Sequence, residues 1–309
     1  MRFLGLFILI FGVIGNIFTI LTLETTKQFY SNPFCVYTVV SIINSIFILI
    51  TQLGLFILDT FLGYSPRATI TWVCKLYAYI NYFPVYVTIT LLALASIDRW
   101  LSTCRNAQLR KYSSKRNAKV SIIFVILFFA IILIPHPIYT EIFYDPTRKT
   151  TRCNRPTRFY KIYTNHILAF NVHFIPLIVM IVFGYLTHCN LSMGYQTRRL
   201  RTLTIKERIN IQMSRTLIIQ VILFVICIVP NWIVNIVYPT FTSHIIDRSA
   251  KRIAIEVFLS NFTMIIYDIN FASAFYIFTF ISPAFRRNFK QLFRLNNTSD
   301  QLDVSSDMF

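Results

Sequence analysis

The chain carries little charge and little glycine. Only 14% of its 309 residues are charged and only 7 are glycine, whereas a soluble domain usually has about 25% charged residues. The sequence contains no Gly-rich phosphate loop and no G-x-S-x-G turn, and its cysteines do not follow a metal-ligand spacing. These absences argue against a nucleotide-binding enzyme, a serine hydrolase and a structural metal site. We therefore expect no enzyme activity, no cofactor and no bound metal.

Apolar residues dominate the sequence instead. They make up 55% of the chain, with 30 phenylalanines and 17 tyrosines, and several apolar runs reach about 20 residues, enough to cross a membrane as a helix. The sequence therefore predicts an all-α membrane protein. Its net charge of +18 would suggest nucleic acid as the partner of a soluble protein. Beside membrane spans it fits anionic lipid and short cytosolic loops, so we expect the lipid membrane as a partner and no nucleic acid.

One apolar stretch, which begins at Cys74 and ends at Trp100, carries reactive groups at both ends. As a helix rising about 1.5 Å per residue it separates Cys74 from Arg99 by about 37 Å, more than the hydrocarbon core of about 30 Å. A thiol able to form a disulfide therefore lies at one water interface. The Asp98-Arg99-Trp100 triplet lies at the other.

This stretch resembles the third helix of a rhodopsin-like (class A) G-protein-coupled receptor. That helix has a cysteine at its outer end and Asp-Arg-Tyr at its inner end, and Trp100 replaces the tyrosine here. The resemblance extends from Gly15 to Phe285. It implies that Asp98, Arg99 and Trp100 form the coupling site for a heterotrimeric G protein, and that Arg99 leaves Asp98 when the receptor is activated.

The resemblance implies a seven-transmembrane helix bundle with a short amphipathic helix on the inner surface. We place the receptor domain at residues 1–294 and a polar cytosolic tail at residues 295–309. The first span could pass for a signal peptide, but no small-residue cleavage site follows it. The expected helices cover about residues 3–23, 33–61, 71–104, 119–139, 163–193, 209–238 and 251–281, and the surface helix covers residues 283–294.

A cysteine in the loop after the fourth helix, Cys153, is similar in position to the family's second conserved thiol. The resemblance implies a disulfide between Cys74 and Cys153, and the alternative is a free thiol. A disulfide requires an oxidising side. This places the protein in the plasma membrane with its N-terminus outside and its C-terminus in the cytosol. The distribution of basic residues agrees only mildly, because the loop around Cys153 is itself basic.

Three asparagines match polar positions of the family's bundle core. Asn16 follows a glycine in the first helix, Asn44 lies in the second and Asn270 in the seventh. An amide inside a membrane favours a partner on a neighbouring helix, so we expect Asn16 to bond to the second and seventh helices. Asn44 stands where the family has an aspartate that helps to bind sodium, and it keeps the hydrogen bonding without the charge.

The sixth helix partly matches the family's switch motif. Phe224, Cys227 and Pro230 are present, and Ile228 replaces the tryptophan. The proline implies a bend about which the inner half of the helix swings. The family's Asn-Pro-x-x-Tyr motif is absent from the seventh helix. These departures leave a decayed or atypical receptor with weak coupling as one alternative.

The same resemblance places six residues in the ligand pocket: Asn81, Tyr82, Trp232, Asn235, Tyr267 and Asp268. Amine receptors carry an aspartate where Asn81 stands, which disfavours an amine ligand. Asp268 replaces the lysine that would hold retinal, which disfavours light sensing. Asp268 is an acid inside a span and can hold a basic or amide group, while the basic outer loop attracts acidic groups. The pattern favours a peptide, as in neuropeptide receptors.

A membrane transporter is the alternative from another functional class. Transporters tend to show repeated halves and helices broken by glycine or proline near the membrane centre. We find no repeat, and Pro176 and Pro230 lie where the receptor family has prolines. The sequence therefore favours a receptor for an extracellular ligand.

Overall fold

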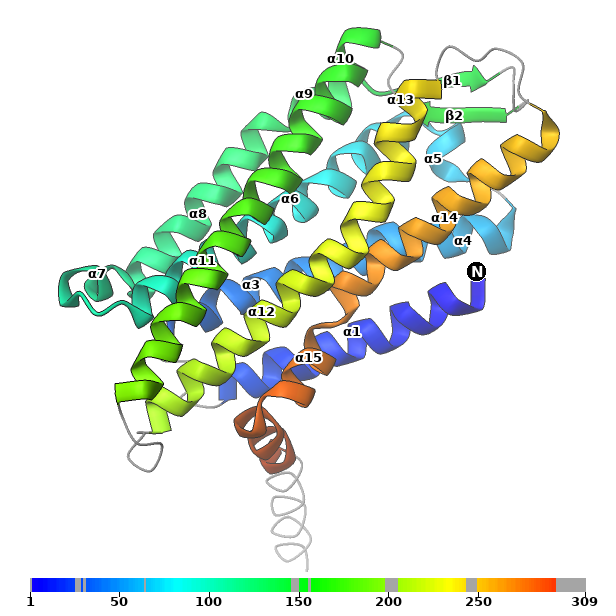
Figure 1. Ribbon diagram of the computed structural model, residues 1–309. Coiled ribbons are helices and arrows are strands. Elements are labelled where there is room, and N and C mark those ends of the chain that lie inside the picture. The colour runs from blue at the N-terminus through cyan, green and yellow to red at the C-terminus, as the bar shows by residue number, and fades with distance from the viewer. Residues whose placement is uncertain are drawn as a thin grey trace, which may run out of the picture.

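The computed structural model describes residues 2–25, 29, 32–63, 65–145, 150–154, 157–197, 205–242 and 249–292. Within this part of the chain, seven helices are long and apolar enough to cross a membrane. Figure 1 shows them side by side in an elongated bundle. A helix satisfies its own backbone hydrogen bonds, which a bilayer requires. The predicted all-α, seven-helix membrane fold is confirmed.

The first three spans begin and end at residues suited to helix termini. They include α1 (Arg2–Thr25), α3 (Pro33–Ile48), the π-helical η1 (Leu49–Gly54), α4 (Leu55–Leu62), α5 (Pro66–Thr69) and α6 (Thr71–Thr103). Asn32 caps α3 by accepting a hydrogen bond from the backbone N–H of Phe34, at 3.2 Å. Pro33 occupies the first turn, where its missing N–H has no cost. Gly63 ends α4 with φ of 65°, a left-handed conformation that favours glycine.

The remaining spans are built from consecutive helical pieces. They comprise α7 (Ala107–Tyr112), α8 (Lys115–Ile132), α9 (Pro135–Ile138), α10 (Arg158–Ile162), η2 (Tyr163–Leu168), α11 (Ala169–Thr197), α12 (Ile205–Trp232), η4 (Ile233–Val237), α13 (Tyr238–Thr242), α14 (Ala250–Ala272), α15 (Ala274–Ile281) and a last helix at residues 283–292. The longest of all, α6, packs mainly against α3 and α11. The third span therefore forms the centre of the bundle.

The seventh span differs from the predicted continuous helix. It is divided into α14 and α15 at Ser273, whose hydroxyl donates to the carbonyl of Asn270 at 2.8 Å. Such local side-chain bonds compete with helix continuation. Around this break α1 approaches very closely, because a Cβ on Gly12 would lie 2.6 Å from Cβ of Ala272. Glycine is required at this contact for reasons of space.

Other helix boundaries shift by several residues. In the fourth span, α8 ends at Ile132, before Pro135. The sixth span begins at Ile205 and not at the predicted residue 209. In the last helix Phe285 is fully buried, while Arg286 and Arg287 are exposed, so the predicted amphipathic helix is present. Its last predicted residues, 293–294, and the tail at residues 295–309 lie outside the described residues.

A β-hairpin, which the sequence analysis did not predict, lies at one end of the bundle. Strands β1 (Glu141–Asp145) and β2 (Thr150–Asn154) pair antiparallel, with Ile142 opposite Cys153. β1 contacts α6 and β2 contacts α5, and Figure 1 shows both strands at the end of the bundle away from α7. Two strands this short give almost no periodic signal, and they depend on the helices beneath them.

Candidate functional site

The end of α6 away from the hairpin carries a buried ion pair. Nη2 of Arg99 lies 2.8 Å from Oδ2 of Asp98, and their side chains are 1% and 7% exposed. The other carboxylate oxygen, Oδ1, accepts a hydrogen bond of 2.7 Å from the hydroxyl of Ser113, just after α7. The two charges therefore compensate each other, and Ser113 holds the carboxylate from the adjacent loop.

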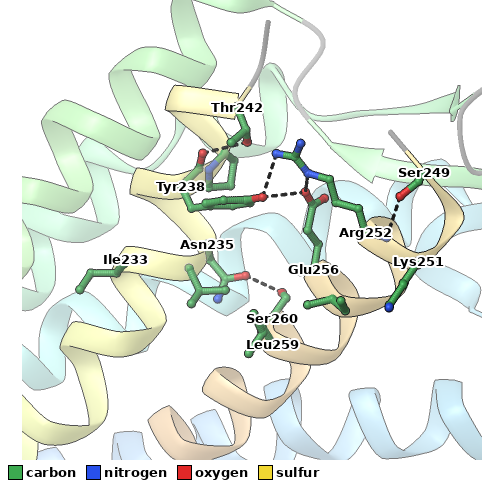
Figure 2. Close-up of a pocket in the computed structure, with 13 residues that line it drawn as sticks. Ile233, Asn235, Tyr238, Thr242, Ser249, Lys251, Arg252, Glu256, Leu259 and Ser260 are labelled. Atoms are coloured by element: carbon green, nitrogen blue, oxygen red, sulfur yellow. Dashed lines mark hydrogen bonds and ion pairs between the residues drawn. The ribbon is translucent and has the colours of Figure 1, made fainter. Parts of the chain in front are cut away.

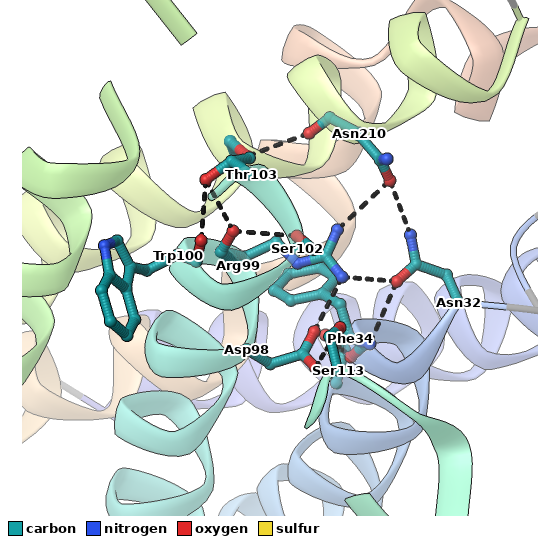
Figure 3. A network of polar contacts seen from close by, with 11 residues as sticks. Asn32, Phe34, Asp98, Arg99, Trp100, Ser102, Thr103, Ser113 and Asn210 are labelled. Atoms are coloured by element: carbon teal, nitrogen blue, oxygen red, sulfur yellow. Dashed lines mark hydrogen bonds and ion pairs between the residues drawn. The ribbon is translucent and has the colours of Figure 1, made fainter. Parts of the chain in front are cut away.

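Two amide side chains complete this cluster from neighbouring helices (Figure 3). Oδ1 of Asn32 accepts a hydrogen bond from Nη2 of Arg99, and Oδ1 of Asn210 on α12 accepts a longer one from Nη1 at 3.4 Å. The amides also bond to each other, since Nδ2 of Asn32 donates to Asn210 at 3.1 Å. Arg99 thereby connects the third span to the start of the second and to the sixth.

Aromatic rings border the charged cluster on two sides. Cζ of Arg99 lies 4.9 Å from the ring centroid of Phe34, an arrangement that favours a cation over the ring face. Trp100 points away from the cluster and packs edge-on against Phe183 of α11, with ring centroids 5.1 Å apart. Of the predicted triplet, Asp98 and Arg99 share the site, while Trp100 contacts the fifth span.

Asn32 and Asn210 were not among the site residues predicted from the sequence. An available signal for Asn32 was its place before Pro33, which is typical of a helix cap. Nothing in the sequence around Asn210 distinguishes it from an ordinary polar residue at the inner end of a helix. Only the tertiary fold brings its amide, on α12, to the guanidinium of Arg99 on α6.

A second polar contact holds the same end of α12. Oε1 of Gln212 accepts hydrogen bonds from the hydroxyl of Ser282 at 2.9 Å and from the backbone N–H of Ala284 at 3.3 Å. Ser282 lies between α15 and the last helix. Asn210 and Gln212 therefore tie one end of the sixth span to the third span and to the end of the seventh.

Replacing Asn210 by leucine is expected to raise ligand-independent signalling severalfold. The change removes an acceptor from the buried guanidinium, and hydrogen bonds to charged groups contribute about 1.5–3 kcal/mol when well formed. The resemblance implies that the inner half of the sixth helix swings on activation, and loss of this contact favours that state. The measurement is basal G-protein dissociation at matched surface expression.

Asn190→Leu is the matched control, because Asn190 is an amide near the same end of α6. It donates to the hydroxyl of Thr103 at 3.4 Å, and no hydrogen bond joins it to Arg99 among the described residues. Basal signalling equal to the parent in Asn210→Leu, or an equal rise in both variants, would contradict the role of the amide contact.

The hairpin end of the bundle contains the predicted disulfide. Cys74 in the first turn of α6 is bonded to Cys153 of β2, with the two Cα atoms 5.6 Å apart, so the prediction is confirmed and the free-thiol alternative is wrong. Beside it, Arg67 pairs with Asp59 at 2.8 Å and donates to the hydroxyl of Tyr77 at 2.8 Å. The loop between the second and third spans is thereby anchored next to the disulfide.

Two predicted pocket residues, Tyr267 and Asp268, are buried side by side on α14. Asp268 is 0% exposed, and among the described residues neither carboxylate oxygen has a hydrogen-bond partner. Tyr267 is also buried and packs edge-on against Phe271, with ring centroids 5.2 Å apart. The fold therefore buries two neighbouring pocket candidates of the seventh span, and one of them is a carboxylate without a partner among the described residues.

The other pocket candidates lie on α6 and at the junction of α12 with η4. Asn81 and Trp232 are half-buried, and Oδ1 of Asn81 and Nε1 of Trp232 have no hydrogen-bond partner among the described residues. Trp232 packs edge-on against Phe174, with ring centroids 4.8 Å apart. Asn235 differs, because it accepts a hydrogen bond from Ser260 and its amide bridges α14 to η4. Asn235 therefore serves the contact between the sixth and seventh spans.

The three predicted core asparagines occupy different environments. Asn16 is fully buried and donates to the carbonyl of Phe271 on α14 at 3.0 Å. Asn270 is also buried, and its Oδ1 has no partner among the described residues. Asn44 is half-buried and donates to the carbonyl of Val40 in its own helix at 3.1 Å. The first and seventh spans are thus joined by an amide, while Asn44 bonds within the second span.

The residues of the predicted helix-6 switch are placed in the core of α12. Phe224 and Cys227 are buried, and Pro230 lies inside the helix near its end. Ile228, which replaces the family's tryptophan, is also buried. The structure therefore buries Phe224 and Cys227 in the core, with an isoleucine where the family has an indole.

An open cavity of about 630 Å³ lies between the sixth and seventh spans near the hairpin end (Figure 2). Within it Arg252 lies 3.1 Å from Glu256 on the same helix and donates to the hydroxyl of Tyr238 at 3.0 Å. Of the predicted pocket residues, Asn235 lines this cavity. In the part of the chain that the structure describes, no cluster of His, Cys, Asp or Glu could hold a metal ion.

A buried Asp-Arg pair at one end of a seven-helix bundle and a disulfide over the other define a heptahelical membrane receptor. The family model described as 7 transmembrane receptor (rhodopsin family) matches residues 15–271. The chain belongs to this family of G-protein-coupled receptors, whose members generally bind extracellular ligands, act through G proteins and are not enzymes. It is a multi-pass membrane protein, and the family match favours the receptor over the transporter.

Proposed function

We propose that this protein is a receptor for an extracellular peptide and that it activates a heterotrimeric G protein. The observation that carries the ligand class is Asp268, a fully buried carboxylate without a partner among the described residues. A buried charge without a partner is costly. A basic or amide group of a bound ligand can offset that cost, so the site favours a ligand that delivers such a group deep into the bundle.

The other predicted pocket residues support a ligand with both polar and aromatic groups. Tyr82, Asn81 and Trp232 offer hydrogen-bonding groups and ring faces from the third and sixth spans. The basic residues of the loop around Cys153 attract acidic groups on the same ligand. Of these, Arg148, Lys149 and Arg155 lie outside the described residues, and only the backbone of Arg152 and Arg158 is described. A peptide combines these features.

The coupling mechanism rests on the closed cluster around Arg99. Nε of Arg99 is buried without a hydrogen-bond partner in the described part of the chain, so the guanidinium is incompletely satisfied there. We propose that ligand binding moves the Asn210 end of α12 outward, that Arg99 leaves the amides, and that a G protein occupies the opened site. The ligand acts by binding the open state more tightly than the closed one.

The same proposal fixes the orientation in the membrane. The disulfide requires an oxidising environment, so the hairpin end faces outside and Arg99 faces the cytosol. The N-terminus is then extracellular and the C-terminus cytosolic, in the plasma membrane. Protease or epitope accessibility at each terminus in intact cells tests this assignment directly.

A panel of peptides and small amines, read by G-protein dissociation, tests the ligand class. Asp268→Asn is expected to raise the half-maximal concentration of the best agonist at least about 30-fold, because truncating one partner of a buried charge pair costs about 2–5 kcal/mol. Asp59→Asn is the control. It removes a carboxylate that is already paired with Arg67, and it should leave the agonist response near that of the parent.

Two results would contradict the proposal. One is a monoamine as the most potent agonist with Asp268→Asn responding like the parent. The other is an equal loss of response in Asp268→Asn and Asp59→Asn, which would indicate a general loss of folding.

A further inference from the structure

The cavity between the sixth and seventh spans opens on the lipid-facing side of the bundle. The exposed apolar residues of α12 and η4 recur three, four or seven positions apart and include Ile226 and Ile233, which are 59% and 47% exposed. On α14 the corresponding row includes Ile255 and Phe258, which are 50% and 58% exposed. Such spacing places each row on one helix face, and in a membrane protein that face contacts lipid.

The wall that α14 forms is basic at the start of the helix and apolar further along it. Ile233, Ile255 and Leu259 supply apolar wall on the two helices. Lys251 lies one turn before Ile255 on the same face, at the end where α14 begins. From Lys251 to Ser260 the lining extends about 13 Å along the helix axis. The groove is therefore amphipathic, with a cation near the water interface and hydrocarbon below it.

In the part of the chain that the structure describes, the charges of the groove leave one cation available. Arg252 is occupied by Glu256 and by the hydroxyl of Tyr238. Lys251 is exposed, and it makes no ion pair with Glu256, the one acidic residue among the described residues that line the groove. The groove thus complements a single negative charge carried on an apolar chain.

We propose that this groove binds an acidic single-chain amphiphile of the fatty-acid class from the outer leaflet. The carboxylate binds Lys251, and the chain lies along Ile255 and Leu259 against Ile233. The occupant contacts both helices beside the bond between Tyr238 and Glu256, which is 3.0 Å long. It therefore stabilises one spacing of the sixth span relative to the seventh, and the site modulates the receptor without sharing the pocket around Asp268.

The test uses the full-length receptor in phosphatidylcholine nanodiscs with a photoreactive palmitic acid analogue. Mass spectrometry is expected to find labelled residues within 233–242 and 249–260. The matching photoreactive amine and lysophosphatidylcholine should label these segments weakly. Lys251→Gln is expected to reduce labelling by the acid about tenfold, the loss that follows from removing one charge-assisted hydrogen bond.

Matched variants separate the groove from general effects on the receptor. Lys75→Gln removes another lysine at the hairpin end, outside the groove, and should label like the parent. Ile255→Trp fills the groove and should reduce labelling, whereas Ile226→Trp adds the same bulk on the lipid face of α12 and should not. Lys251 is exposed, so its variant remains informative should the Ile255 variant fold poorly.

Equal labelling by acid and amine, or parental labelling of Lys251→Gln, would overturn the proposal. The readout is binding and does not depend on the proposed peptide ligand or on G-protein coupling. A negative labelling result therefore does not argue against the proposed peptide receptor. Equally, the labelling result can be interpreted when no peptide agonist is found.

Discussion

Replacing Arg99 by alanine is expected to abolish G-protein activation by any agonist. The guanidinium is the group that the proposed mechanism releases from Asp98, Asn32 and Asn210 and presents to the G protein. Without it the opened site lacks its cation. Agonist-stimulated nucleotide exchange on purified G protein, at matched amounts of receptor, measures the effect.

The buried partner of Arg99 complicates the single variant. Removing one member of a buried ion pair leaves the other uncompensated and costs about 3–5 kcal/mol, although Ser113 still donates to Asp98. The double variant Asp98→Asn/Arg99→Ala removes both charges, and it should also fail to signal while reaching the cell surface. Asp98→Asn alone is expected to raise basal signalling, because the carboxylate restrains the guanidinium.

Arg110→Ala is the control for loss of positive charge near the same end. Arg110 is exposed and donates to backbone carbonyls of residues 104 and 105 at 3.0 Å. It should signal close to the parent level. Agonist responses that survive in both Arg99 variants would show that G-protein coupling does not depend on this cluster.

Loss of the disulfide is expected to reduce surface expression severalfold. Cys74→Ser frees β2 from α6, and removal of a native disulfide typically costs about 2–5 kcal/mol. A destabilisation of this size changes cellular abundance severalfold. Cys74 is fully buried, so the serine also leaves a hydroxyl in a space shaped for sulfur. Flow cytometry of an N-terminal epitope on intact cells provides the measurement.

Cys153→Ser and the double variant test whether the bond itself is responsible. Both should lower expression to the same extent as Cys74→Ser, since each removes one and the same bond. Cys189→Ser changes a free cysteine near the end of α11 that lies away from the hairpin. This variant should express like the parent. Additive losses in the double variant would show that the two cysteines act separately and not as a bond.

The amino-acid sequence alone determined the class of this protein. Apolar runs of about 20 residues with few charges can only be accommodated by spanning helices, so the all-α bundle followed from composition and length. The spacing of Cys74 and Arg99 along one helix placed these two residues at opposite ends of the bundle. The resemblance of this helix to the family's third helix, with Cys153 in the loop after the fourth, implied the disulfide that the structure contains.

Only the tertiary structure decided which groups meet. Asn32 and Asn210 are ordinary polar residues in the sequence, and the packing of three spans makes them partners of Arg99. The hairpin was not predicted because its strands are stabilised by contacts with α5 and α6, and not by their own periodicity. Asp268 is a further case, because only the fold shows that its carboxylate is buried without a hydrogen-bond partner among the described residues. Long-range contacts between spans carry no local signal, and for that reason only the fold revealed the cluster around Arg99 and the groove between the sixth and seventh spans.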